Sequence, residues 1–319
     1  MSSWLQRPRV PFALFLAIAL LLTEIAVQPS FAKPGNWAGE LAVLAPFAIL
    51  AMASTPSILS GGAGVDLSIG PLSTVANCIF VTWLLPHGFG GVPAVLIVLA
   101  IGTAVGAFNG FLVAVLRYQP VVATLCVLFI LAGFAQKIAP NPVSLPENWT
   151  AHLAGSIGFL PGALITIGFP LAVWAILGRT SFHRTLYAVG GGDASAYSAG
   201  IDVVRVRIIA YALGGLFAAV GGIALTALIQ TSSAAVSTQY ALIALAGVAL
   251  GGTPIGGGRG GMVPSLLGAF CIFMLQQLLS SAGVSASYQQ LVYGTLLIAG
   301  VLLSVRFPRG LVLRSVASS

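Results

Sequence analysis

The chain has 319 residues, of which 58% are hydrophobic and 6% are charged, and its mean hydropathy is +1.04. Soluble proteins carry roughly a quarter charged residues, so this composition excludes the soluble classes and indicates a polytopic membrane protein built from helices. The net charge of +7 does not imply a nucleic-acid partner. Basic residues that gather at the cytoplasmic ends of membrane spans explain it, and they suit the anionic headgroups of a lipid membrane.

Successive apolar segments predict ten transmembrane helices in one all-α domain that covers residues 1–319. They lie at 11–27, 41–59, 71–85, 93–116, 121–138, 161–177, 208–229, 240–250, 263–279 and 291–305. The first segment also resembles a secretory signal sequence, but its length and the charge pattern favour an uncleaved span. Glu24 within it is costly in lipid, so we expect this side chain near the outer end of the span or against a neighbouring helix.

Positive charges predict how these segments are oriented. With both termini in the cytoplasm, eleven arginines fall on the cytoplasmic side, whereas only Lys33 and Lys137 fall outside. The cytoplasmic set is Arg7, Arg9, Arg117, Arg179, Arg184, Arg205, Arg207, Arg259, Arg306, Arg309 and Arg314. We therefore expect a multi-pass protein with both ends inside the cell.

The stretch 179–207 is the longest polar interruption that also carries clustered charge. Its middle predicts one short helix, with Asp193 as the N-cap, Ala194 in the first turn, and Gly200 followed by Ile201 as the stop signal. An ordinary solvated connector is the alternative. Because the loop is basic and cytoplasmic, it is a candidate contact surface for a cytoplasmic partner.

Two glycine-rich breaks interrupt the apolar pattern, SGGAGVDLSIGP at 60–71 and GGTPIGGGRGGMVP at 251–264. Each ends in a proline that suits the first turn of a new helix, and Cys-Ile-Phe follows seven residues after each proline, at Cys78 and Cys271. Paired broken spans in corresponding halves point to a transport pathway. The pattern predicts a weak internal repeat whose two copies run parallel.

Four polar residues in these segments are candidates for the solute pathway. Asp66 either caps the amides of Ser68 and Ile69 or serves transport directly. Asn77 and Asn109 either make interhelical hydrogen bonds or face the solute. We predict a pathway formed by Asp66, Ser68, Asn77 and Asn109, whose mainly neutral groups suit an uncharged, hydroxylated solute.

The sequence shows no motif for catalysis, cofactor binding or metal binding. The glycine run 256–261 lacks the lysine and hydroxyl of a phosphate-binding loop, and the three histidines are scattered without metal-ligand spacing. We therefore expect no enzymatic activity. Carboxylates within the spans, which ion-coupled carriers usually need, are almost missing, so we expect energy to come from a separate subunit.

Four ordered segments resemble the sugar permeases of bacterial ATP-binding-cassette (ABC) importers, the ribose-type family related to branched-chain amino-acid permeases. They are GGAGVDLSIG, FNGFLVAVLRYQPVVATL, YAVGGGDASAYSAGI and LGGTPIGGGRG. The resemblance implies a permease subunit of the bacterial inner membrane that carries a monosaccharide or small polyol. A branched-chain amino acid as the solute, or an ion-coupled secondary carrier, is the alternative.

The same resemblance implies partners and a second set of functional residues. The partners are cytoplasmic ABC ATPase subunits, a periplasmic sugar-binding protein, and a second permease chain, identical or related. The coupling helix that docks on the ATPase would comprise Gly190, Gly191, Asp193, Ala194, Gly200 and Ile201. Here the chain departs from the family, because Gly192 replaces the usual Asn and Tyr197 stands where a basic residue is common.

Overall fold

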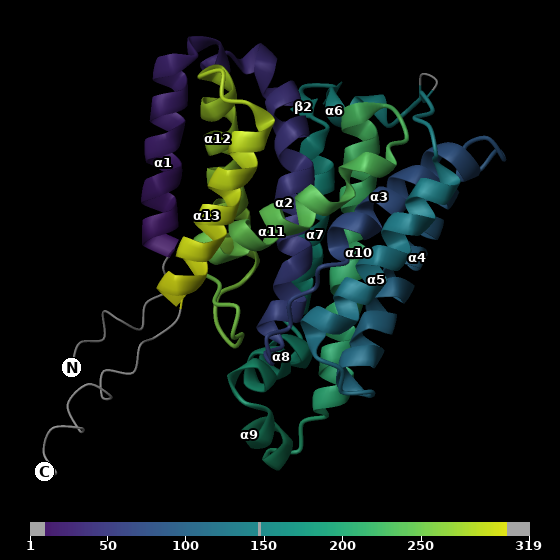
Figure 1. Ribbon diagram of the computed structural model, residues 1–319, viewed down its shortest axis with the longest axis vertical. Helices are drawn as coiled ribbons and strands as arrows, with labels where there is room; N and C mark the ends of the chain where they lie inside the picture. The colour runs from purple at the N-terminus through teal and green to yellow at the C-terminus, as the bar shows by residue number, and fades with distance from the viewer. Residues whose placement is uncertain (1–9, 146–147, 305–319) are drawn as a thin grey trace, which may run out of the picture.

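The computed structural model describes residues 10–145 and 148–304, which form a bundle of helices (Figure 1). The main helices are α1 (Val10–Val27), α2 (Trp37–Leu59), α3 (Ile69–Ile79), α4 (Gly91–Ala114), α5 (Pro120–Ile138), α7 (Ala163–Leu177), α8 (Ser181–Gly191), α9 (Asp193–Ser198), α10 (Val203–Ile229), α11 (Ser237–Leu250), α12 (Met262–Ser281) and α13 (Ala286–Ser304). Short elements complete the chain: η2 (Pro29–Ala32), η3 (Pro34–Asn36), η4 (Phe80–Leu84), α6 (Ala151–Ala154), β1 (Ser156–Ile157), β2 (Leu160–Pro161) and η5 (Ala234–Val236).

The described part of the chain has five helices that are long and apolar enough to cross a membrane, namely α2, α4, α5, α10 and α12. A sixth candidate is the pair α7 and α8, which bends by 89°, and shorter apolar helices accompany them. Large apolar side chains such as Leu96, Phe129 and Ile130 lie exposed on α4 and α5, as expected for helix faces that contact lipid. The all-α, multi-pass class predicted from the sequence is thereby confirmed.

Helix α2 forms the centre of the bundle. Every residue from 44 to 59 is buried, and α2 packs against α10, α12, α11 and α7. It contains Pro46 and Pro56, which remove backbone donors, a loss that a helix tolerates when neighbouring groups surround it. Protein surrounds residues 44–59 on all sides, so this stretch shows no one-sided apolar pattern; it is mostly apolar, and its polar members are Ser54, Thr55 and Ser57.

Helices α4 and α10 approach each other through small residues. Gly102, Gly106 and Gly110 repeat every fourth residue on α4 and face α10, where Gly215 is in direct contact. A side chain at Gly106 would collide with the backbone oxygen of Tyr211 and with Gly215. Small residues at this spacing allow two membrane helices to pack at the backbone distance where dispersion contacts are most favourable.

Both predicted breaks interrupt the helices where the sequence places them. Pro71 is the third residue of α3, and Pro264 is the third residue of α12, so both prolines lie in a first helical turn, where no backbone donor is needed. The π-helical turn η4 extends α3 to Leu84. Helices of the two predicted repeat copies pack against each other, because α2 packs on α11 and α12 and α3 packs on α11.

The polar stretch 179–207 contains two helices, α8 and α9, where one was predicted. Gly190 and Gly191 belong to the end of α8, and Gly192 separates the helices with extended backbone. Figure 1 places α8 and α9 at one end of the bundle, and α1 begins and α13 ends toward that same end. Five of the predicted cytoplasmic arginines, Arg7, Arg9, Arg306, Arg309 and Arg314, lie outside the described residues.

Candidate functional site

Helix α9 begins one residue earlier than its sequence suggests. Asp193 is the first helical residue and Gly192 is the N-cap, so the prediction of Asp193 as N-cap is wrong. The predicted stop is correct: Gly200 has a φ of 79°, and the amide of Ile201 donates to the carbonyl of Ala196 across 3.1 Å. This left-handed turn satisfies the end of the helix. Ala194 lies in the first turn.

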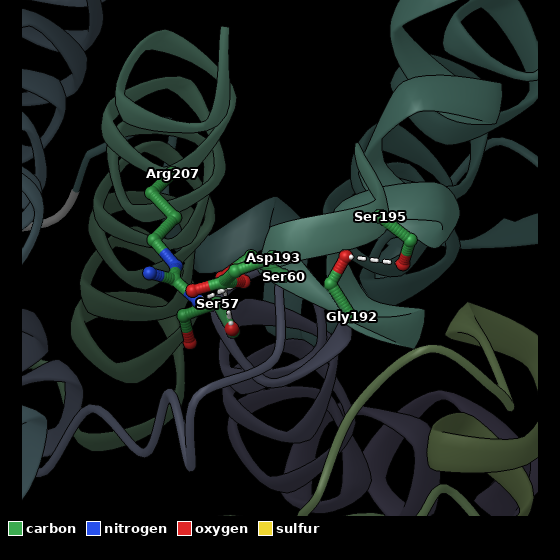
Figure 2. Close-up of polar contacts among 6 residues, drawn as sticks. All are labelled: Ser57, Ser60, Gly192, Asp193, Ser195 and Arg207. Atoms are coloured by element: carbon green, nitrogen blue, oxygen red, sulfur yellow. Dashed lines mark hydrogen bonds and ion pairs between the residues drawn. The ribbon is translucent and has the colours of Figure 1, made fainter. Parts of the chain in front are cut away.

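The carboxylate of Asp193 forms an ion pair with α10 in place of the cap. Arg207 Nη2 donates to Asp193 Oδ1 at 2.7 Å, and Figure 2 shows these two side chains pointing toward each other beside the end of α2. Arg207 is 14% exposed and Asp193 is 51% exposed. The same figure shows Ser195 Oγ donating to the carbonyl of Gly192. The position of α9 is therefore tied to α10.

Four glycines from three distant segments meet beside α8, and we name this contact the glycine junction: Gly61, Gly190, Gly257 and Gly258. A Cβ added at Gly190 would overlap with the carbonyl oxygen of Leu59 and the amide of Gly258. The amide of Gly258 donates to the carbonyl of Leu59 at 3.2 Å. Both breaks of the predicted repeat therefore touch each other and touch α8.

Tyr187 adds a side-chain contact to the glycine junction. Its hydroxyl donates to the carbonyl of Gly260 at 2.8 Å. Burial raises the pKa of the Tyr187 hydroxyl, so the group stays protonated and able to donate at neutral pH. This contact could not be predicted, because Tyr187 and Gly260 belong to separate polar segments with no pattern in common.

Three of the four predicted pathway residues lie together at the first break, two in the break itself and one on α4. Asp66 Oδ1 accepts from the amide of Ser68 at 2.9 Å and from its hydroxyl at 2.6 Å. Asn109 Nδ2 of α4 donates to the hydroxyl of Ser68 at 2.7 Å. The predicted cap on Ser68 is confirmed, whereas the hydrogen bonds of Asp66 within the described chain do not include the amide of Ile69.

Asn77 belongs to a separate cluster on α3. Its side chain donates to Thr226 Oγ1 at 2.9 Å and to the carbonyl of Thr231 at 3.1 Å, and it accepts from the amide of Ser233 at 3.2 Å. All four predicted pathway residues are buried within the single chain. Asn77 thus links α3 to both sides of the turn that ends α10.

A cavity of about 680 Å³ opens between α9, α10, the α4–α5 connection and the first break. Its lining includes Gly61, Arg117, Asp193, Arg207 and Tyr211. Tyr211 is fully buried, and its hydroxyl has no hydrogen-bond partner among the described residues. Sequence reasoning missed Tyr211, because a tyrosine inside an apolar span has no distinguishing pattern.

The glycine junction, the ion pair and the cavity place α9 where a displacement would reach both breaks. The site has no arrangement of a nucleophile with a base, and no three His, Cys, Asp or Glu side chains within the described residues lie together as a metal-binding group. The site consists of close backbone contacts and a cavity with polar side chains, an arrangement that fits coupling of a movement of α9 to a movement of the two breaks.

Comparisons with known proteins give one consistent result. Residues 38–301 match the family model described as "Branched-chain amino acid transport system / permease component". The ribose import permease of Escherichia coli strain K12 is 32% identical over 308 residues, covering 94% of each chain. That of Bacillus subtilis strain 168 is 32% identical over 296 residues, covering 91% of each chain.

A relative with another named sugar also matches. The fructose import permease of Bifidobacterium longum strain NCC 2705 is 31% identical over 271 residues, which cover 80% of this chain and 78% of the relative. No solved structure matches the chain.

Proposed function

The chain belongs to the family of branched-chain amino acid transport system permease components, and on that basis we propose that it imports a monosaccharide or similar small polyol as the permease subunit of an ABC importer. The family match makes it a transmembrane permease component. The sugar is supported by relatives named as ribose and fructose import permeases. Their names favour a sugar over a branched-chain amino acid, although the family model carries the name of the latter.

The proposed topology has ten spans, formed by α1, α2, α3 with η4, α4, α5, α7, α10, α11, α12 and α13. The α8/α9 end then faces the cytoplasm of a bacterial cell. Arg117 shares a cavity with Asp193 at that end, and Arg259 lies in the break that contacts α8. Lys33 and Lys137 lie in connections or turns at the opposite end. This distribution follows the positive-inside bias.

We place the coupling surface on residues 190–201. Gly200 and Ile201 close α9, Asp193 and Ala194 present its first turn, and Gly190 and Gly191 end α8. A cytoplasmic ATPase that moves α9 would move α8 with it, and Gly190 fits between the two breaks without free space. This contact of Gly190 with both breaks is the observation that carries the proposed mechanism.

The solute would pass between this chain and a second permease chain, identical or related, after delivery by a periplasmic sugar-binding protein. Asp66, Ser68 and Asn109 would serve the cytoplasmic half of the pathway, and Asn77 the other half. Asn109 Oδ1 and the Tyr211 hydroxyl have no hydrogen-bond partner among the described residues, so both are available to a sugar hydroxyl once the first break moves.

Uptake by reconstituted vesicles tests this function. Proteoliposomes that contain the permease and its ATPase are supplied with the binding protein and labelled ribose or fructose. They should accumulate the sugar only when ATP is present on the side of the membrane where the ATPase lies. An uncoupler, which removes the proton gradient, should leave the rate of sugar uptake unchanged. Uptake of leucine in place of sugars would favour the amino-acid alternative, and uptake that needs an ion gradient but no ATP would overturn the importer.

A further inference from the structure

The cavity of about 680 Å³ beside α9 has more positive than negative charge among its described lining residues. Arg117 comes from the connection between α4 and α5, Arg207 lies near the start of α10, and the acidic residue is Asp193 of α9. Arg207 pairs with Asp193 (Figure 2), whereas Arg117 forms no ion pair with any described residue. One positive charge of this lining is therefore not balanced.

The guanidinium group of Arg207 has more donors than its one partner accepts. A guanidinium carries several N–H donors, but among the described residues this side chain donates one hydrogen bond, from Nη2 to Asp193 Oδ1 at 2.7 Å. It is only 14% exposed and lies over the first break, since a Cβ added at Gly62 would come within 2.8 Å of Nη2. The donors that Asp193 does not use remain available to an acceptor in the cavity.

The hydroxyl of Tyr211 is a second group of the lining without a partner. Tyr211 is fully buried, and its hydroxyl has no hydrogen-bond partner among the described residues. The ring clusters with Val113 of α4 and Ala123 of α5, so it lies where α4, α5 and α10 meet. A buried hydroxyl without a hydrogen bond is unfavourable. Because Tyr211 belongs to the lining, an acceptor bound in the cavity would satisfy it.

Two long helices start at this cavity. The lining includes residues 119–120 at the start of α5 and residues 203–204 at the start of α10. Backbone amides in the first turn of a helix lack an intrahelical acceptor, and the helix dipole makes this end positive. Gln119 provides no side-chain cap for α5. The ends of both helices therefore favour a negative charge in the cavity.

The negative groups close to these helix ends already have partners. The carboxylate of Asp202, which caps α10, pairs with Arg205 Nε at 3.0 Å. At the C-terminal end of α4, the carbonyl of Leu112 accepts from the amide of Tyr118 at 3.1 Å. These contacts leave the unused donors of Arg117, Arg207 and the two helix starts as the main polar feature of the cavity.

We propose that this cavity binds a phosphate group, held by Arg117, Arg207 and the hydroxyl of Tyr211. Guanidinium groups match phosphate oxygens with parallel N–H donors. Two sources have this chemistry, the headgroup of an anionic phospholipid and a free phosphate. Val115 and Leu116 are exposed beside Arg117 and offer an apolar surface to acyl chains, and basic pockets between membrane helices bind anionic headgroups.

A bound phosphate would join the α4–α5 connection to α10 next to Asp193. It would share Arg207 with Asp193 and thereby change how firmly α9 is held. An effect on coupling depends on the proposed function, whereas the binding does not and is measured without transport.

Thermal unfolding of the purified full-length protein in an uncharged detergent tests the binding. Dioctanoyl phosphatidylglycerol is compared with dioctanoyl phosphatidylcholine, and inorganic phosphate is compared with chloride at equal ionic strength. At about ten times the dissociation constant, the bound probe should raise the unfolding midpoint by about 2 °C or more. A rise with phosphatidylglycerol but not with inorganic phosphate supports a lipid, and a rise with inorganic phosphate supports a soluble phosphate. No rise with either probe overturns the proposal.

Three variants locate the binding. Arg117→Gln removes the charge of an exposed side chain and Tyr211→Phe removes only the hydroxyl, so each should weaken binding of the stabilising probe by about tenfold or more. Arg184→Gln, at an exposed arginine of α8 outside the lining, is the matched control and should bind as the wild type does. Unchanged binding in Arg117→Gln or Tyr211→Phe overturns the proposal, and so does equal weakening in Arg184→Gln.

Tyr211→Phe also separates binding from folding. Without a probe, this variant should unfold at the wild-type midpoint or above it, because it loses a buried hydroxyl that has no partner. Its weaker response to the probe then reports the lost contact with phosphate. A lower midpoint without a probe, together with an unchanged response to the probe, would make the hydroxyl a structural group and overturn the proposal.

Discussion

At the scale of single residues, Gly190 and Gly191 differ in the space that surrounds them. The two glycines are neighbours in an uninterrupted run of three. A Cβ at Gly190 would overlap with Leu59 and Gly258, whereas a Cβ at Gly191 would meet nothing within 4 Å. Segments from three parts of the chain pack around Gly190 and leave the space beside Gly191 open.

This difference predicts opposite effects of the same substitution. Gly190→Ala should displace α8 from the two breaks and lower ATP-dependent uptake by about tenfold, an effect of ~1.4 kcal/mol on the coupled step. Gly191→Ala should leave uptake within about twofold, because the added methyl group has space and alanine favours the helical state by up to 1 kcal/mol. The measurement is uptake in proteoliposomes at equal amounts of inserted protein. Equal loss of uptake in both variants would contradict a role of the glycine junction in coupling.

Ser68 receives one hydrogen-bond partner from its own segment, Asp66, and one from a distant helix, Asn109. A carboxylate in a glycine-rich break could be predicted to cap a nearby amide, and the bond to Ser68 confirms this. The hydrogen bond between Asn109 and Ser68 joins residues 41 positions apart. It depends on α4 passing beside the first break, and no local pattern contains that information.

At the scale of elements, helix positions follow from the sequence more closely than helix contacts. Apolar length predicts where α4, α5 and α10 lie, because a span must satisfy its own backbone hydrogen bonds in lipid. It does not predict α8, because the polar stretch indicated a single helix that starts after the glycine run. Gly192, whose extended backbone interrupts the helical hydrogen bonding, separates α8 from α9.

Because α4 and α10 are in close contact, a large side chain at that contact should lower the stability of the protein far more than the same side chain on an open helix face. Gly106→Leu should destabilise the protein by roughly 1–3 kcal/mol or more, because the side chain must push two backbones apart. Gly133→Leu on α5 is the matched control, since a Cβ there meets nothing within 4 Å. Thermal unfolding in detergent or nanodiscs should show a lower midpoint for Gly106→Leu only. Equal midpoints for both variants would show that α4 can separate from α10 without cost.

At the scale of the whole molecule, helices from the two halves of the predicted repeat pack against each other. Helix α2 of the first half lies against α12 of the second, and α3 lies against α11. Three identical residues after each proline indicated the repeat, and the matching positions of Pro71 and Pro264 at the third residue of a helix support it. These contacts between the halves could not be foreseen, since an apolar segment does not encode which of several apolar neighbours it meets.

The contact between α2 and α12 predicts a cross-link that reports relative movement of the two halves. Thr55 Oγ1 of α2 donates to Ser265 Oγ of α12 at 2.8 Å, so Thr55→Cys with Ser265→Cys would place two thiols at a separation that a disulfide can bridge. With Cys78, Cys126 and Cys271 changed to alanine, mild oxidation should form this disulfide. If the breaks move apart during each cycle, oxidised protein should lose uptake and regain it with a reductant, because rigid attachment of α2 to α12 opposes a hinge or shear motion.

The single variants separate the cross-link from side effects of substitution. Thr55→Cys or Ser265→Cys alone, in the same cysteine-free background, should transport equally before and after oxidation. Both positions are fully buried, so slow oxidation is expected, and completeness is measured by mass spectrometry of the peptides that span the two sites. Full uptake by completely cross-linked protein would show that α2 and α12 move as one body, and movement of α9 would then have to reach the solute through α10 and the Asp193–Arg207 ion pair.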